Sequence, residues 1–192
     1  MNTLLFATNN QHKIQEIQSA IGDRLKVTGL KEAGINIDIP EPHNTLEENA
    51  KEKSSVIYAL TGKNCFSEDT GLEVYALNGE PGVRSARYAG GRSDSDNIEK
   101  LLKNLKNAPS RKARFRTVIS LFWNNKEYLF EGICEGTIAE GTKGTKGFGY
   151  DPVFIPEGAE KTFAEMEMNE KNSYSHRKKA ASQMVVFLQT VI

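Results

Sequence analysis

Three carboxylates are the first candidates for chemistry in this sequence. Glu68 and Asp69 are adjacent, and Glu41 lies between two prolines in an earlier segment. Carboxylate oxygens bind hard cations such as Mg²⁺, and a carboxylate at a strand end can orient or deprotonate a water molecule. The alternative is a solvated acidic turn, which is commoner for an isolated Glu-Asp pair. Both hypotheses place the pair in a turn at residues 68–71, directly after a short strand.

A second candidate is the polar segment that follows the first apolar run, residues 3–7. Its side chains are Thr8, Asn9, Asn10, Gln11, His12 and Lys13. Hydroxyl, amide and ammonium donors there meet the free N–H groups of a helix expected over residues 12–21, an arrangement that suits phosphate. From spacing alone, an ordinary capped turn is the commoner explanation. The sequence has neither a GxxxxGK[ST] nor a GxGxxG motif.

Lys53 is a cation on an otherwise apolar helix face. Thr45 and Glu48 form a capping-box pattern that predicts a helix over residues 45–60. On that helix, Lys53 shares one stripe with Leu46, Ala50 and Ile57. Burial of an ammonium group is costly unless it meets an anion or extends to solvent. Lys53 therefore either points at a carboxylate or a phosphate, or extends from a partly exposed helix.

An aromatic and glycine segment closes a glycine-rich tract. It consists of Phe148, Gly149, Tyr150 and Asp151. Glycine lets the backbone approach a ligand closely, and an aromatic ring offers a stacking face for a base. The alternative is a flexible hairpin exit with a core phenylalanine.

The last candidates are His176 and Arg177, with Lys171 just upstream. His176 falls on the inward stripe of a helix expected over residues 175–191, where a lone histidine is more often a core residue. The adjacent arginine favours a role in binding an anion or the edge of a base.

The elements that must position these residues alternate between strand and helix. We expect strands over residues 3–7, 26–30, 35–39, 65–67, 72–77, 112–123, 127–138 and 151–155, and helices over residues 12–21, 45–60, 96–105 and 175–191. Residues 124–126 predict a hairpin turn. Alternating strands and helices together with an antiparallel hairpin predict one α/β domain, residues 1–192, with a mixed sheet.

Composition excludes several classes of protein. The 192 residues carry 25 Lys and Arg against 25 Asp and Glu, so the basic excess typical of duplex nucleic-acid binders is absent. Two widely spaced cysteines, Cys65 and Cys134, fit neither a zinc site nor a disulfide framework. No signal peptide or membrane span is evident. We expect a soluble cytoplasmic protein that binds neither nucleic acid nor membrane.

Taken together, these segments resemble the inosine triphosphate pyrophosphatase family, which hydrolyses non-standard purine nucleoside triphosphates. The resemblance runs over nearly the whole chain, in order: LLFATNNQHK, TLEENAKEK, SEDTGLEV, GEPGVRSARYAGG, GFGYDPVF and EKNSYSHR. The family often has two aspartates and a serine where this chain has Glu68, Asp69 and Thr70. These changes keep a carboxylate and a hydroxyl.

The resemblance implies an elongated mixed sheet flanked by helices, two lobes with a central cleft, a homodimer and a Mg²⁺ requirement. It implies water attack at the α-phosphorus, which yields a nucleoside monophosphate and pyrophosphate. Carried over by position, Glu41, Glu68 and Asp69 would hold the metal, with Asp69 as general base. The substrate would be bound by the segment 8–13, Lys53, Thr70, Lys171, the segment 148–151, His176 and Arg177.

Two rival functions stay open. One is a pyrophosphatase of the Maf-like group with another nucleotide specificity, which the SHR and FGYD segments disfavour. The other is a nucleotide-binding sensor without catalysis, which the acidic pair disfavours.

Overall fold

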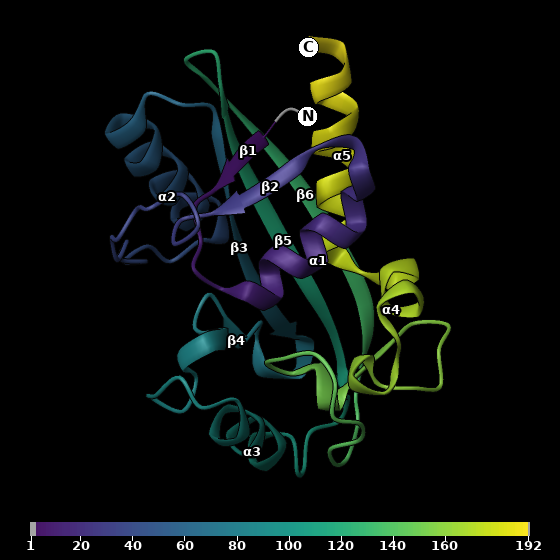
Figure 1. Cartoon of the computed structure of the whole chain (residues 1–192). Helices are drawn as coiled ribbons and strands as arrows, with labels where there is room; N and C mark the ends of the chain where they lie inside the picture. Colours follow the sequence, from purple (N-terminus) through teal and green to yellow (C-terminus); the bar gives the residue numbers. More distant parts are fainter. Residues whose placement is uncertain (1–2, 192) are drawn as a thin grey trace. The chain divides into compact units, whose positions relative to one another are not determined.

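The computed structural model describes residues 3–191, except for the side chain of Arg24. Its strands are β1 (Thr3–Phe6), β2 (Lys26–Gly29), β3 (Cys65–Val74), β4 (Pro81–Gly82), β5 (Lys112–Trp123), β6 (Lys126–Ile138) and β7 (Phe154–Pro156) (Figure 1). Its α-helices are α1 (Gln11–Ile21), α2 (Leu46–Thr61), α3 (Asp94–Asn104), α4 (Met168–Tyr174) and α5 (His176–Val191). None of the described helices is long and apolar enough to cross a membrane.

The strands form one mixed sheet in the order β2-β1-β3-β5-β6-β7, with β4 paired to β3. β1 runs parallel to both β2 and β3, whereas β6 and β7 are antiparallel. The predicted mixed sheet with flanking helices is confirmed. Asn124 and Asn125 both have positive φ, as the predicted tight hairpin between β5 and β6 requires.

The chain divides into two compact units. Unit 1 contains residues 1–69, 117–132 and 177–192, and unit 2 contains residues 70–116 and 133–176. Two units agree with the two lobes that the resemblance implies, and the cleft between lobes stays a prediction.

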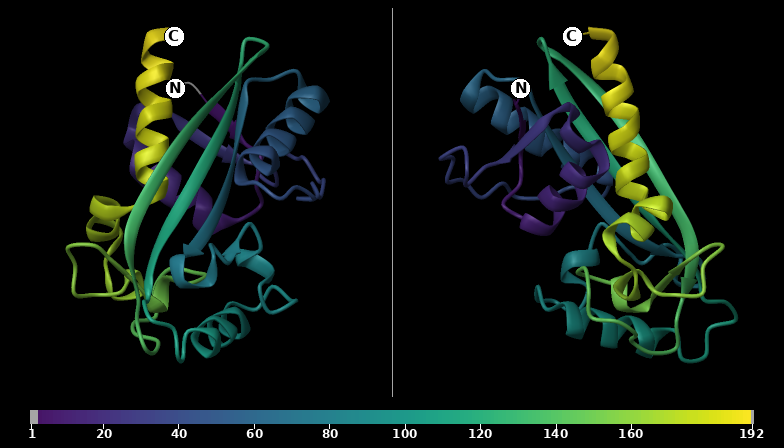
Figure 2. Two further views of the ribbon diagram at one scale, coloured as in Figure 1. Left: turned by 180° about the vertical axis from the view of Figure 1, so that it is seen from behind. Right: turned by 45° about the vertical axis from the view of Figure 1, so that its right-hand side comes forward.

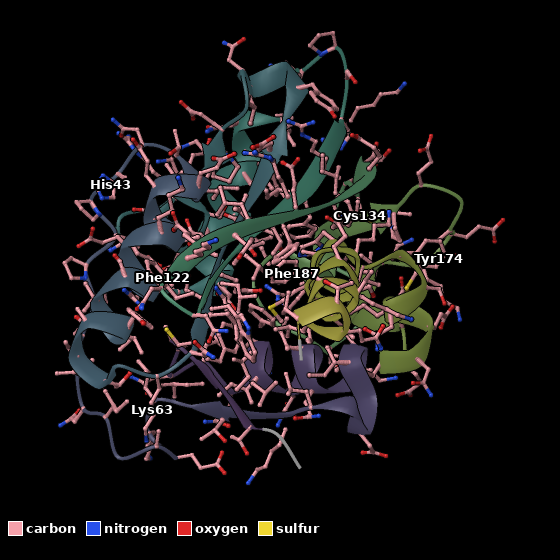
Figure 3. The ribbon with its side chains drawn as sticks, turned by 90° about the horizontal axis from the view of Figure 1, so that it is seen from above. His43, Lys63, Phe122, Cys134, Tyr174 and Phe187 are labelled. Carbon is pink, nitrogen blue, oxygen red and sulfur yellow. The ribbon has the colours of Figure 1, made fainter. Side chains whose placement is uncertain are left out.

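In unit 1, helices cover both faces of the sheet because apolar side chains alternate along β1. Leu4 and Phe6 pack in a cluster with residues of α1 and α5, and Leu5 packs in another with residues of α2. Figure 2 shows α1 and α5 side by side. In Figure 3, Phe122 lies on the α2 side of the strands and Phe187 on the α5 side.

In unit 2, the core is built on three phenylalanines. Phe115, Phe154 and Phe163 contact one another, with ring centroids 4.6 to 6.1 Å apart. Ile98 and Leu101 of α3 join the same cluster. This core supports the segment between β6 and β7.

The acidic turn predicted at residues 68–71 is wrong, because β3 runs without interruption from Cys65 to Val74. Gly71 serves close packing instead: a Cβ there would lie 2.6 Å from the carbonyl oxygen of Gly82 on β4. Glu68 and Asp69 are therefore buried in the middle of a strand.

Three other predictions need correction. The strand predicted over residues 72–77 ends at Val74, and Tyr75–Leu77 is a 3-10 turn. The described residues 35–39 form no strand, although Ile35, Ile37 and Ile39 still pack against the α2-side cluster. The predicted strand over 151–155 is a 3-10 turn, Asp151–Val153, followed by β7. The apolar alternation over residues 35–39 thus identified side chains that pack against the core, but these are only partly buried and the segment has no strand partner.

Candidate active site

Glu68 and Asp69 lie on opposite faces of β3, because neighbouring side chains of a strand point in opposite directions. Glu68 contacts residues of α1 and α5, and Asp69 contacts residues of α2. Both residues are buried. The acidic pair therefore supplies two separate charge clusters rather than one.

The Glu68 cluster is centred on Arg177. Arg177 donates from Nε and Nη2 to Glu68, at 2.7 and 2.9 Å, and from Nη1 to Glu16 of α1. Lys13 lies 2.9 Å from the same Glu68 carboxylate. Burial alone would raise the pKa of Glu68, but Arg177 and Lys13 outweigh it and hold the pKa well below its usual range. Glu68 is therefore a fixed anion in the folded protein.

The Asp69 cluster is centred on Lys53. The Lys53 Nζ atom lies 2.6 Å from Glu41 Oε1 and 3.0 Å from Asp69 Oδ1. Only 7% of Lys53 is exposed, so the predicted burial is confirmed and the alternative of a solvent-directed lysine is wrong. Burial lowers the pKa of Lys53, but Asp69 and Glu41 outweigh it and raise the pKa above its ordinary value. Burial raises the pKa of Asp69, although Lys53 and Lys13 oppose the shift.

Asn49 connects the Asp69 cluster to the loop that carries Glu41. Its Nδ2 donates to Asp69 Oδ2 at 3.4 Å and to the carbonyl oxygen of His43 at 3.2 Å. Its Oδ1 accepts from the His43 N–H at 3.0 Å. The buried amide therefore ties the loop to α2, which places Glu41 next to Lys53.

The segment 8–13 forms the capped start of α1. Asn10 is the N-cap, and its side chain accepts from the Lys13 N–H at 3.2 Å. The Asn10 N–H in turn donates to Thr8 Oγ1 at 3.1 Å. Asn9, Gln11 and His12 are exposed. The capped turn is confirmed, and anion binding by this segment stays a prediction.

In unit 2, Asp151 and Lys171 form a buried ion pair of 2.6 Å. The Phe148 N–H also donates to Asp151 Oδ2, at 3.0 Å. Lys171 Nζ lies 5.7 Å from the Phe148 ring centroid and 5.2 Å from that of Phe163. These contacts fix the turn that presents Phe148.

His176 and Arg177, predicted to act together, belong to different units. The His176 ring stacks on Phe115 in unit 2, at 4.7 Å and 16° between planes, whereas Arg177 belongs to the Glu68 cluster of unit 1. Within unit 1 the structure places Lys13, Glu41, Lys53, Glu68, Asp69 and Arg177. Within unit 2 it places Thr70, the segment 148–151, Lys171 and His176.

Comparison with known proteins assigns the family. The model of the Ham1 family matches residues 4–187. The chain belongs to the Ham1 family. It is 49% identical over 187 residues to the dITP/XTP pyrophosphatase of Flavobacterium psychrophilum, with 97% of this chain and 98% of that protein covered. It is 50% identical over 190 residues to the dITP/XTP pyrophosphatase of Porphyromonas gingivalis, with 98% of each covered.

Solved structures of the family agree. The Staphylococcus aureus Ham1 protein superposes with a TM-score of 0.88 at 40% identity, with 100% of both chains covered. A HAM1 protein from Coxiella burnetii gives 0.88 at 36% identity, covering 99% of this chain and 100% of the other. The resemblance stated from the sequence motifs is thereby confirmed.

Against this family background, the predicted metal ligands fit Mg²⁺ only in part. Glu41 and Asp69 offer oxygen atoms of the kind Mg²⁺ prefers, and both already converge on one cation, Lys53 Nζ. Glu68 points to the other face of β3 and holds Arg177 and Lys13. Within residues 3–191 no group of three or more His, Cys, Asp or Glu is arranged to hold a metal.

Two members of this Ham1 site were missed from the sequence. Glu16 lies three residues after Lys13 on α1, and Asn49 lies four residues before Lys53 on α2. Residues at these spacings share a helix face, so the helix period offered a signal for both. Neither could be singled out without its distant partners.

Proposed function

We propose that this protein hydrolyses non-standard purine nucleoside triphosphates, such as dITP and XTP, to the nucleoside monophosphate and pyrophosphate. Such hydrolysis would remove these nucleotides from the precursor pool. The observation that carries the proposal is the cluster of Asp69 on β3, Lys53 on α2 and Glu41 on the preceding loop, in a chain about half identical to dITP/XTP pyrophosphatases. The activity belongs to one pyrophosphatase domain over residues 1–192, active as a cytoplasmic homodimer.

Asp69 is the general base of the proposed reaction. It orients the attacking water and accepts its proton as the water oxygen approaches the α-phosphorus. The position of Asp69 supports this role, because a carboxylate that Lys53 and Asn49 hold in place can orient a water molecule and accept its proton. Lys53 keeps the carboxylate in place.

The cationic groups of unit 1 bind the triphosphate. Lys13 and the N–H groups at the start of α1 face the phosphates, with the polar side chains of the segment 8–13 around them. When bound, Mg²⁺ would be held by Glu41 and Asp69 and would neutralise charge on the phosphate oxygens. We leave Glu68 out of the metal set because its carboxylate is committed to Arg177 and Lys13.

The base stacks on the ring of Phe148. Lys171 binds the Asp151 carboxylate and lies next to the Phe148 ring, and its ammonium group is buried. We therefore assign it to positioning this ring rather than to binding phosphate. Three N–H groups of Arg177 donate to Glu68 and Glu16, and Arg177 is buried, so its proposed role is to hold these carboxylates rather than to contact the base. His176 and Thr70 complete the proposed substrate set.

Product analysis tests the proposed function. We expect dITP and XTP to yield monophosphate and pyrophosphate in the presence of Mg²⁺, with turnover lost in EDTA because charge on the phosphates is no longer neutralised. Canonical dATP and dGTP are the controls and should be hydrolysed at least about 100-fold more slowly, as expected when a polar group of the wrong base is left unpaired.

Other products would contradict the proposal. Diphosphate and orthophosphate would mean attack at the γ-phosphorus. A preference for other nucleotides would favour a Maf-like specificity. Tight nucleotide binding without turnover would favour a sensor.

A further inference from the structure

Two consecutive backbone N–H groups in the Phe148 turn are held by carboxylates from different elements. The Phe148 N–H donates to Asp151 Oδ2 at 3.0 Å, and the Gly149 N–H donates to Asp94 Oδ2 at 2.7 Å. Asp151 belongs to the turn itself, whereas Asp94 lies 55 residues before Gly149 in the chain. Hydrogen bonds to a charged acceptor are among the stronger ones, so the peptide groups before Phe148 and before Gly149 are each held by one carboxylate.

The local backbone needs such restraint. Gly147 and Gly149 both have positive φ, at 75° and 61°, so glycine permits the turn without fixing its shape. At Gly147, a Cβ would lie 2.0 Å from Asp151 Oδ2, which shows how tightly the turn wraps that carboxylate. Nothing comparable surrounds Gly149, where open space lies around the Cβ position. The restraint at Gly149 comes from Asp94.

Asp94 is well placed to supply this restraint because α3 is firmly anchored. It is the first residue of α3, after the N-cap Ser93. Asn97, one turn later, accepts from the Ala89 N–H at 2.7 Å and donates to the carbonyl oxygen of Ala86 at 3.3 Å. Ile98 and Leu101 of the same helix are buried in the unit 2 core. Asp94 therefore reaches the turn from a rigid support.

The other side of the turn is held as well. The Tyr150 hydroxyl donates to the carbonyl oxygen of Ser85 at 2.9 Å, and Tyr150 is buried. Lys171 lies near the Phe148 ring and binds Asp151. With Asp94 included, each residue from Phe148 to Asp151 has a fixed contact. The ring of Phe148 is the group of this turn that the proposed function assigns to the base.

We propose that Asp94 is a positioning residue for the purine-binding ring of Phe148. By holding the Gly149 N–H, it keeps the Phe148 ring in one orientation before the nucleotide arrives, which lowers the entropy lost on binding. The inference rests on the proposed function, because it takes the base of a purine nucleotide as the group that stacks on Phe148. It also means that the N–H groups of Phe148 and Gly149 hold the turn rather than read the base.

The test compares Asp94→Ala with Asp96→Ala. Both carboxylates lie in the first turn of α3 and have the same sign of interaction with the helix dipole, but only Asp94 contacts the turn. We expect Asp94→Ala to weaken the binding of inosine monophosphate and to raise KM for XTP by about tenfold, with kcat nearly unchanged. Asp96→Ala should leave both near wild type. Asp94→Asn keeps an acceptor oxygen and should restore most of the affinity.

A double-variant cycle separates positioning from stability. In a Phe148→Ala background, the Asp94→Ala change should no longer affect the affinity for inosine monophosphate, because there is no ring left to position. An undiminished effect in that background, or equal effects of Asp94→Ala and Asp96→Ala, would overturn the proposal, as would absence of inosine monophosphate binding by the wild type. Binding of inosine monophosphate without hydrolysis of XTP would instead reject the proposed function, and the affinity cycle would still decide the role of Asp94.

Discussion

Asp69→Asn is expected to lower kcat for dITP by about 1,000-fold while the protein folds as the wild type does. Asparagine has the size and shape of aspartate, and its single side-chain oxygen can still accept from Lys53. Its NH2 group then replaces the oxygen that accepts from Asn49, and it cannot take a proton from water. The measurement is steady-state hydrolysis of dITP with pyrophosphate detection, together with urea denaturation of the same preparation. The affinity for inosine monophosphate should stay close to that of the wild type.

Glu73→Gln is the matched control for Asp69→Asn. Glu73 lies on the same strand, β3, and also carries an ion pair, 2.7 Å from Arg114. That pair is partly exposed, so its loss should cost at most about 1 kcal/mol of stability and leave turnover unchanged. If Asp69→Asn retained most of the wild-type kcat, Asp69 would not be the base.

The parts of the fold predicted correctly are those set by local sequence. Helix α2 begins after its cap Thr45 and ends at Gly62, which takes the left-handed conformation expected of a helix stop. The hairpin turns at Asn124 and Asn125, two residues that tolerate positive φ. In both cases, residues within a few positions determine the backbone, so the sequence was sufficient.

β3 was mispredicted because its determinants are not local. Two acidic residues followed by a threonine and a glycine suggest a turn, yet the strand crosses the core because distant cations neutralise the acids. Glu68 is paired with Arg177, 109 residues away, and Asp69 with Lys53, 16 residues away. Once the charges are paired, nothing in the segment prevents an extended backbone.

The candidate site shows the same division. The helical stripe placed Lys53 on the apolar face of α2, because the face follows from the helix period, but it left open whether the ammonium group meets an anion or extends to solvent. Glu16, Asn49 and Asp94 were missed because each is a polar residue of a helix, and polar residues are ordinary in the sequence of a helix with one solvent-facing side. What distinguishes them is a partner on another element, and a single sequence does not show which elements meet.

Arg177→Met is expected to lower the free energy of unfolding by about 4 kcal/mol near neutral pH. The variant leaves two buried carboxylates, Glu68 and Glu16, without the guanidinium that holds them. The Glu68 side chain is fully buried and only 5% of the Glu16 side chain is exposed. Water therefore cannot replace the lost guanidinium group. Urea denaturation in EDTA measures the loss without any contribution from bound metal.

The loss should depend on pH in a defined direction. In the wild type, the folded-state pKa of Glu68 lies below its unfolded value, so the stability it contributes is present above about pH 4.3 and is lost as the pH falls toward the folded pKa. In Arg177→Met, an uncompensated buried carboxylate is relieved by protonation, so acid costs the variant less. The difference in stability between the two proteins should therefore shrink as the pH falls from neutral into the acid range.

Arg114→Met provides the comparison for this pH experiment. Arg114 also pairs with a glutamate, Glu73, but 31% of its side chain and 19% of that of Glu73 are exposed. Solvent can take over part of the lost interaction, so we expect a loss of about 1 kcal/mol at most and little change with pH. One contradicting outcome is that Arg177→Met lowers the free energy of unfolding no more than Arg114→Met does. The other is that its loss of stability is the same near neutral pH and in acid. In either case, Arg177 would not be the residue that makes the buried position of Glu68 tolerable. Glu68 would then have to be neutralised chiefly by Lys13, which already lies 2.9 Å away.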